Sequence, residues 1–189
     1  MKTFRDNLLA AFRNNLLAAI VVILLTLFVV KVCSATEIGL SLDYGWPITT
    51  PHGIKSTASN ITAIIGGQPS NRLFIGIETQ LSHLSFNTGD STEVLSFSPI
   101  LKYDFIRLKS ITFYALMGCG IGFQNGGAPI DVLGHNPLGV IKAGVGIGIP
   151  LSNRIDLDIQ CKYDHFSSHN PGDSGVNYLG PVMGLTWRW

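Results

Sequence analysis

The sequence predicts an all-β protein, an eight-stranded antiparallel transmembrane β-barrel. Only 13% of its 189 residues are charged and 21 are glycine, a composition poor in charge for a soluble domain and typical of glycine-rich membrane strands. After residue 35, segments of about ten residues alternate apolar and polar side chains and are separated by turn residues, as expected of strands that cross an outer membrane. The chain ends on Trp189, and a terminal aromatic residue on the apolar parity resembles the assembly signal of outer-membrane barrels.

Residues 1–35 are predicted to be a signal peptide that precedes a barrel of residues 36–189. Positive charges come first, at Lys2, Arg5 and Arg13. An almost unbroken apolar run from Leu16 to Val30 follows, and small residues at Cys33 and Ala35 stand before Thr36. The run is shorter than the ~20 residues of a spanning helix. A retained anchor is the alternative.

Eight strands are expected, at 37–46, 59–67, 72–86, 93–106, 110–123, 138–149, 154–167 and 176–189. In the first strand the even-numbered residues are apolar, whereas the second is the least regular. In the third and fourth the apolar residues hold the odd positions, mainly from Leu73 to Leu81 and from Leu95 to Phe105. Because successive strand residues point to opposite faces, each of these sets forms one face of a sheet.

The last four strands follow the same rule. Odd-numbered residues are apolar from Ile111 to Ile121 in the fifth strand and from Ile155 to Cys161 in the seventh, where acids alternate with them. The sixth strand carries glycines on its even positions from Gly144 to Gly148, and the eighth places Leu179 to Trp189 on mostly apolar odd positions. The apolar parity is expected to face lipid.

The opposite parity collects charges of both signs, which are expected to pair inside the barrel with a structural role, because a small barrel fills its interior with side chains. These residues are Asp43, Glu78, Lys102, Asp104, Lys142, Asp156, Asp158, Lys162, Asp164 and Arg188. We interpret them neither as an ion channel nor as a metal site. The net charge of +1 gives no reason to expect nucleic acid or another polyanion as partner.

The connections predict the orientation of the barrel. Those at 68–71, 107–109 and 150–153 are short, whereas those at 46–59, 87–91, 124–136 and 168–175 are mostly longer and rich in Gly, Pro, Asn and His. Short periplasmic turns and longer external loops are the pattern of outer-membrane barrels. The expected location is therefore the outer membrane of a Gram-negative cell.

Cys119 and Cys161 are expected to be free thiols. Both have the outward parity, on the fifth and seventh strands, so one strand separates them and their backbones should lie roughly 9–10 Å apart. A disulfide needs Cα atoms closer than about 7 Å.

His165 and Ser167 have the parity of the apolar residues of the seventh strand. They therefore point the same way, into lipid, at the external end of the strand. An imidazole can take the proton of a serine hydroxyl and so activate it as a nucleophile. Backbones two residues apart on a strand lie about 6.6 Å apart, which permits a dyad between the two side chains.

The stretch from His165 to Gly172, followed by Gly175-Val176-Asn177 and a final aromatic strand, resembles the lipid A deacylase family. The resemblance implies an outer-membrane esterase that removes the 3-O-linked acyl chain of lipid A, the lipid part of the lipopolysaccharide of the outer leaflet. It assigns His165 as general base and Ser167 as nucleophile. This chemistry needs no metal or organic cofactor.

The chain departs from that family at the group that orients the histidine. The resemblance implies a glutamate at the start of the last strand, but the residue with matching parity is Asn177. Asp173 in the preceding loop is the alternative orienting group, and another register would place Ser174 there. An amide stabilises an imidazolium less than a carboxylate does.

The sequence is also compatible with other functions. One is a barrel without catalysis, either a structural or adhesive protein or a deacylase-like barrel impaired at Asn177. Another is a different lipid-modifying barrel such as an acyltransferase. His83, outward near the external end of the third strand, is expected to lie at the membrane interface.

Overall fold

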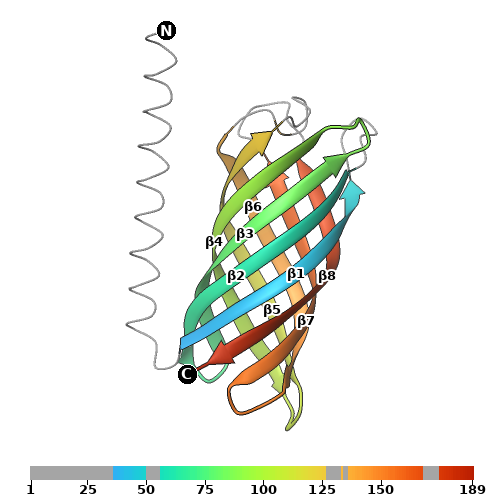
Figure 1. Ribbon diagram of the computed structural model, residues 1–189. Helices are drawn as coiled ribbons and strands as arrows, with labels where there is room; N and C mark the ends of the chain where they lie inside the picture. Colours follow the sequence, from blue (N-terminus) through green and yellow to red (C-terminus); the bar gives the residue numbers. More distant parts are fainter. Residues whose placement is uncertain (1–35, 50–55, 127–132, 134–135, 168–174) are drawn as a thin grey trace, which may run out of the picture.

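The protein is a closed barrel of eight antiparallel strands in a computed structural model, which describes residues 36–49, 56–126, 133, 136–167 and 175–189 (Figure 1). Each strand pairs with the next along the chain, and β8 closes the sheet on β1. The strands are β1 (Thr36–Thr49), β2 (Ser56–Ser70), β3 (Leu73–Phe86), β4 (Ser91–Arg107), β5 (Thr112–Gly126), β6 (Leu138–Pro150), β7 (Ile155–Ser167) and β8 (Val176–Arg188). The predicted fold class is confirmed.

Most strands are longer than the sequence pattern predicted. The largest difference is in β2, predicted over 59–67 and observed as Ser56–Ser70. Ser56 pairs with Phe86 and Ser70 with Leu73, so the ladder continues to both ends of the barrel. The alternation of side chains fades before the backbone pairing does, because near the ends neither face is fully in lipid.

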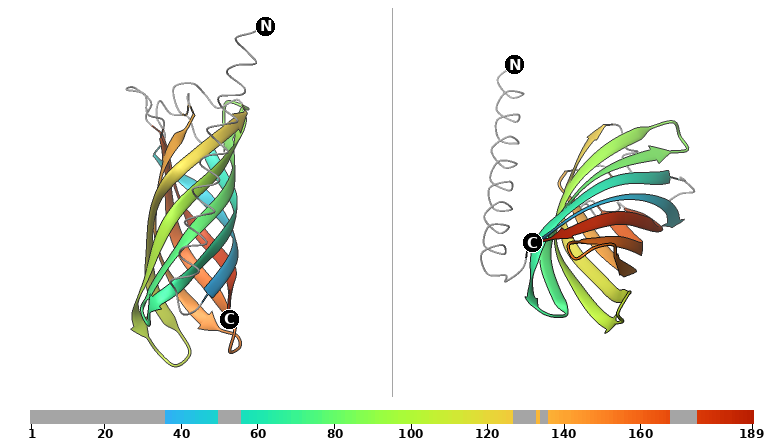
Figure 2. Two further views of the ribbon diagram at one scale, coloured as in Figure 1. Left: turned by 90° about the vertical axis from the view of Figure 1, so that its left-hand side faces the viewer. Right: turned by 60° about the horizontal axis from the view of Figure 1, so that its bottom comes forward.

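Side-chain parity divides the molecule into a polar interior and an apolar outer wall. In β6 the inward Lys142 is 1% exposed, whereas its outward neighbour Ile141 is 54% exposed. Leu40, Leu42 and Met183, also outward, are more than half exposed. Every strand runs diagonally across the barrel (Figure 2), as expected because closing a sheet into a barrel requires its strands to tilt.

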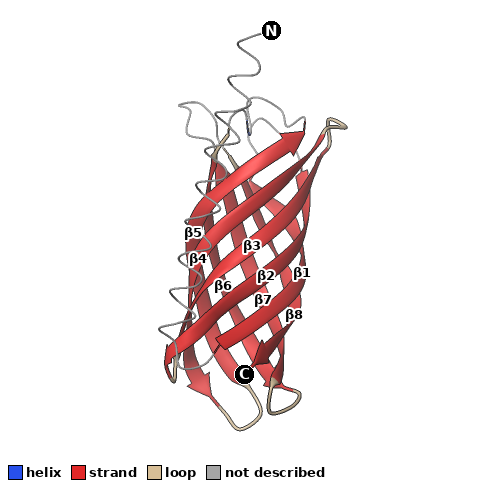
Figure 3. Cartoon of the chain, turned by 60° about the vertical axis from the view of Figure 1, so that its left-hand side comes forward, coloured by secondary structure: helices blue, strands red, loops and turns tan. Residues whose placement is uncertain are grey.

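The connections lie at the two ends as predicted. The short β2–β3, β4–β5 and β6–β7 turns lie at the end that also holds the start of β1 and the C-terminus, which we call the turn end (Figure 3). The opposite end, which we call the loop end, carries the tight β3–β4 turn, where Gly89 adopts a φ of 94° and its N–H donates to Phe86 O at 3.1 Å. The predicted signal peptide and most of the three longer connections lie outside the described residues. The described residues include no helix that is long and apolar enough to cross a membrane.

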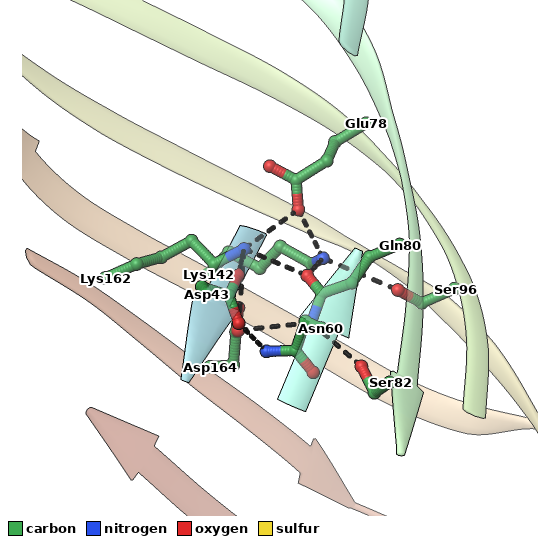
Figure 4. A network of polar contacts seen from close by, with 9 residues as sticks. All are labelled: Asp43, Asn60, Glu78, Gln80, Ser82, Ser96, Lys142, Lys162 and Asp164. Carbon is green, nitrogen blue, oxygen red and sulfur yellow. Dashed lines mark hydrogen bonds and ion pairs between the residues drawn. The ribbon is translucent and has the colours of Figure 1, made fainter. Parts of the chain in front are cut away.

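The barrel interior holds a network of opposite charges (Figure 4). Lys142 Nζ donates to Glu78 Oε1 at 2.5 Å and also contacts Gln80 Oε1. Lys162 Nζ lies 3.0 Å from Asp43 Oδ2 and 3.5 Å from Glu78 Oε1. None of the four charged side chains is more than 4% exposed. The predicted internal pairing is confirmed.

A second group of charges lies nearer the turn end. Arg188 Nε lies 3.2 Å from Glu37 Oε1, and its guanidinium also pairs with Asp156. Lys102 Nζ lies 3.8 Å from Glu37 Oε2 and 5.0 Å from the centre of the Tyr114 ring. The carboxylates of this group therefore have positive partners on other strands.

Glycines on the inner parity allow the wall to curve tightly. A Cβ at Gly180 would lie 1.9 Å from Tyr44 O, and one at Gly120 would lie 2.0 Å from Phe97 O. No side chain fits there, so these glycines are required by the close approach of neighbouring backbones. Cys119 and Cys161 are free and exposed, as predicted from their placement on β5 and β7.

Replacing Lys142 by alanine is expected to destabilise the barrel by about 3–5 kcal/mol, because Glu78 would keep a buried charge with one cation fewer. The control is Arg154→Ala, at an exposed arginine of the β6–β7 turn, which should change the free energy of unfolding by less than about 1 kcal/mol. Urea titration of the barrel in lipid vesicles, followed by tryptophan fluorescence, measures both. Equal losses for the two variants would contradict the internal role of Lys142.

Candidate functional site on the outer wall

The outer wall of β7 and β8 carries His165, Ser167 and Asn177 together at the loop end. The interleaved residues fix this orientation: Phe166 and Val176 are paired across the two strands and are 0% and 1% exposed in the interior cluster. Burial of these two apolar side chains turns their neighbours outward, because strand residues alternate. The predicted parity of the histidine and the serine is therefore confirmed.

His165 is held by Asn177 from the adjacent strand. The two residues are directly opposite in the β7–β8 register, and His165 Nδ1 lies 2.8 Å from Asn177 Oδ1. The hydroxyl of Tyr163 donates to the same oxygen at 2.5 Å. A carbonyl oxygen only accepts hydrogen bonds, so the imidazole proton resides on Nδ1. In the neutral ring this leaves Nε2 with a free lone pair, the state required of a general base.

Ser167 is the next outward residue of β7 after His165 and is half-buried. Its partner on β6 is Gly139, which has no side chain to crowd the hydroxyl. Within the described part of the chain, no hydrogen bond joins Ser167 Oγ to the imidazole. Such bonds are often long before substrate is present and tighten in the complex.

Gly175 shapes the wall beside the imidazole. Its φ is 65°, and a Cβ there would lie 2.5 Å from Phe166 O and 3.0 Å from His165 Cε1. A glycine is therefore needed for β8 to begin this close to the histidine. Neither this contact nor the Tyr163 hydrogen bond was predicted. The available signal for Tyr163 was its position two residues before His165, on the same face.

The alternative orienting residue Asp173 lies outside the described residues, as does Ser174. Asn177 is the predicted orienting residue that the structure brings to the imidazole, and its catalytic role stays a prediction. In the described ranges, no cluster of three or more His, Cys, Asp or Glu side chains could hold a metal ion.

An apolar groove lies below this site on the outer wall, towards the middle of the membrane. It has a volume of about 730 Å³. Leu179, one of its lining residues, pairs with Tyr163, so the groove begins directly beneath the Tyr163–Asn177 contact. It continues over Cys161 and Val145 to Ile159. From the loop end towards the middle of the membrane, the outer wall therefore presents first the polar side chains of the site and then the apolar groove.

No protein-family model and no curated protein sequence matches this chain. The fold is similar to that of solved outer-membrane proteins. The crystal structure of the outer membrane enzyme PagL has a TM-score of 0.57 at 14% identity and covers 79% of this chain and 98% of that one. A neisserial surface protein, NspA, has a TM-score of 0.54 at 12% identity, with 82% and 96% covered.

The outer membrane protein OprG of Pseudomonas aeruginosa gives 0.55 at 7% identity, with 83% and 96% covered. At these identities the likeness concerns the fold. Together with the apolar outer wall, it identifies the protein as an outer-membrane β-barrel.

The hydrogen-bond pattern predicts that neutral His165 is the Nδ1–H tautomer. ¹⁵N NMR of the barrel with labelled histidine, assigned by loss of the signal in His165→Gln, should show a protonated Nδ1 and an unprotonated Nε2. Asn177→Leu removes the acceptor and should abolish this preference. Tyr163→Phe removes only the second donor and should keep it. An Nε2–H tautomer in the wild type would contradict the assignment.

Proposed function

We propose that the protein is an outer-membrane esterase, a lipid A 3-O-deacylase, with Ser167 as nucleophile and His165 as general base. The observation that carries the proposal is the hydrogen bond of 2.8 Å between His165 Nδ1 and Asn177 Oδ1 on a wall that faces lipid. This bond orients Nε2 for proton transfer, and the next outward side chain on the strand is a serine hydroxyl. The resemblance of the segment after His165 to the lipid A deacylase family supports the choice of substrate.

The proposed reaction follows from these roles. Ser167 Oγ attacks the ester carbonyl while His165 Nε2 takes the hydroxyl proton, and the imidazolium then gives that proton to the departing sugar hydroxyl. Water hydrolyses the acyl-serine with the same base and releases a hydroxy fatty acid. No cofactor takes part. The neutral Asn177 holds the ring but contributes no negative charge to stabilise the imidazolium.

The apolar groove supports a substrate with a long acyl chain. Lipid A lies in the outer leaflet, with its sugars at the level of the loop end and its chains beside the outer wall. A chain that enters beneath Tyr163 would pass Leu179 and Cys161 along the groove, while its ester stays near Ser167. Burial of methylene groups against this wall gives no advantage over lipid, so the groove selects by shape and position rather than by hydrophobicity.

The competing function is a surface-interaction or structural barrel without catalysis. It is favoured by the amide at Asn177 in place of a carboxylate, and the similar structures NspA and OprG are described only as a surface protein and an outer membrane protein. In that case the external connections, rather than β7 and β8, would carry the function.

Expression in a Gram-negative host followed by mass spectrometry of its lipid A separates these functions. The deacylase predicts loss of one hydroxyacyl mass, abolished in Ser167→Ala and retained in Ser85→Ala, an outward serine of β3 far from β7. A gain of mass would indicate acyl transfer instead. Unchanged lipid A with a folded barrel in the outer membrane would support the non-catalytic function and overturn the proposal.

Replacing Asn177 by aspartate is expected to raise the deacylation rate. The two side chains have the same shape, but a carboxylate also stabilises the imidazolium. In a serine protease, replacing the aspartate beside the catalytic histidine by asparagine lowers kcat by about 10⁴-fold. We expect an increase of at least about tenfold in kcat, measured as fatty acid released from purified lipid A. Asn177→Leu should lower it. A rate unchanged in both variants would contradict an orienting role for Asn177.

A further inference from the structure

A second row of polar side chains crosses the outer wall at the loop end, on strands other than β7 and β8. Ser59 of β2 is directly opposite His83 of β3, and His83 is directly opposite Glu93 of β4. All three side chains are exposed on the outward parity. The imidazole therefore stands between a hydroxyl and a carboxylate, in the order of a serine, a base and an acid.

The spacing suits proton transfer along the row. Directly opposite residues of neighbouring strands have Cβ atoms about 4.5–5.5 Å apart, within reach of a hydrogen bond between these side chains. In the described part of the structure, no side-chain hydrogen bond or ion pair engages any of the three. The three side chains can therefore close on a ligand without breaking a side-chain hydrogen bond or ion pair.

The surroundings place the row at the boundary between polar and apolar surface. The next row towards the membrane consists of Leu42, Ile61, Leu81 and Leu95, paired in register across β1 to β4. Leu42, Ile61 and Leu81 join Ser59, His83 and Glu93 in lining a groove of about 400 Å³. An amphipathic ester whose chain lies along the leucines would present its carbonyl to the polar row.

We propose that Ser59, His83 and Glu93 form a second ester-hydrolysing site on the outer wall, separated from the β7–β8 site by β1 and acting on acyl esters of membrane lipids. The proposal does not depend on the function proposed for Ser167. It differs from that site in one respect that matters chemically: the group beside the histidine is a carboxylate, Glu93, rather than an amide.

The reaction balances with these three groups and water. Ser59 Oγ forms a bond to the ester carbonyl carbon, and its proton passes to His83. The carbon–oxygen bond to the alcohol breaks, and the departing oxygen takes the proton from the imidazolium. Water, deprotonated by the same histidine, then cleaves the acyl-serine to a free fatty acid and regenerates Ser59. Glu93 accepts a hydrogen bond from the other ring nitrogen and stabilises the imidazolium.

A neutral alkyl fluorophosphonate tests the proposal, because it phosphonylates serines that an adjacent base activates. The full-length barrel in vesicles of phosphatidylcholine is treated with the probe and digested with trypsin. Ser59 then lies between the cleavage sites Lys55 and Arg72, and Ser167 between Lys162 and Arg188. Fragmentation of the two peptides assigns each label to its serine.

The expected result is a label on Ser59 that is lost in His83→Ala and slowed at least about tenfold in Glu93→Gln. Ser91→Ala, an exposed serine one row nearer the loop end on β4, is the matched control and should leave the rate unchanged. All four positions are on the outer surface, and heat-modifiable migration on a gel confirms that each variant is folded. An unlabelled Ser59 in the wild type, or a label that persists in His83→Ala, overturns the proposal.

Hydrolysis of a short-chain p-nitrophenyl ester by the same vesicles separates the two sites. In a Ser167→Ala background, residual hydrolysis that Ser59→Ala abolishes supports the second site. Hydrolysis that disappears completely with Ser167→Ala overturns it and leaves the β7–β8 site as the esterase. If the probe labels Ser59 but expression of the protein leaves the mass of lipid A unchanged, only the function proposed for Ser167 is overturned.

Discussion

Closure of the sheet, by pairing of β8 with β1, is the constraint on which the rest of this structure depends. In hydrocarbon, an unpaired backbone N–H or C=O costs several kcal/mol, so a strand at an open edge could not remain in the membrane. Closing eight strands leaves a narrow interior that side chains must fill. Backbones approach so closely that glycine is required at Gly180 and Gly120. The charges of Lys142, Lys162 and Glu78 can be buried because both lysines form ion pairs with the glutamate.

A filled interior leaves the outer wall and the two rims for chemistry. This reverses the usual relation in a soluble protein, where the face that carries the apolar side chains of a strand is the core. Here that face meets lipid, so a substrate of either proposed site would reach it from the side, within the membrane. Polar side chains on this face, such as His165 and His83, lie at the loop end.

The two polar sites on the wall use the same strand geometry in different ways. In one, the hydroxyl and the imidazole of Ser167 and His165 lie two residues apart on one strand, and only Asn177 comes from the neighbour. In the other, Ser59, His83 and Glu93 come from three successive strands in register. The first arrangement has its orienting hydrogen bond in place. The second has the carboxylate, which the first lacks. They therefore offer complementary tests of what an esterase on a lipid-facing wall requires.

The sequence by itself determined the number of strands and which side chains face lipid. The reason is that apolar and polar residues alternate along each single strand, so the pattern does not depend on which strand lies beside it. For the same reason the outward placement of His165, Ser167, Cys119 and Cys161 was predictable. Which residues face one another across strands depends on register. Register is set by the turns and by burial of residues such as Phe166 and Val176, so only the tertiary structure could decide it. It paired His165 with Asn177 and brought Tyr163 to the same oxygen. It also aligned Ser59, His83 and Glu93, which span 34 positions of the chain and share no local pattern.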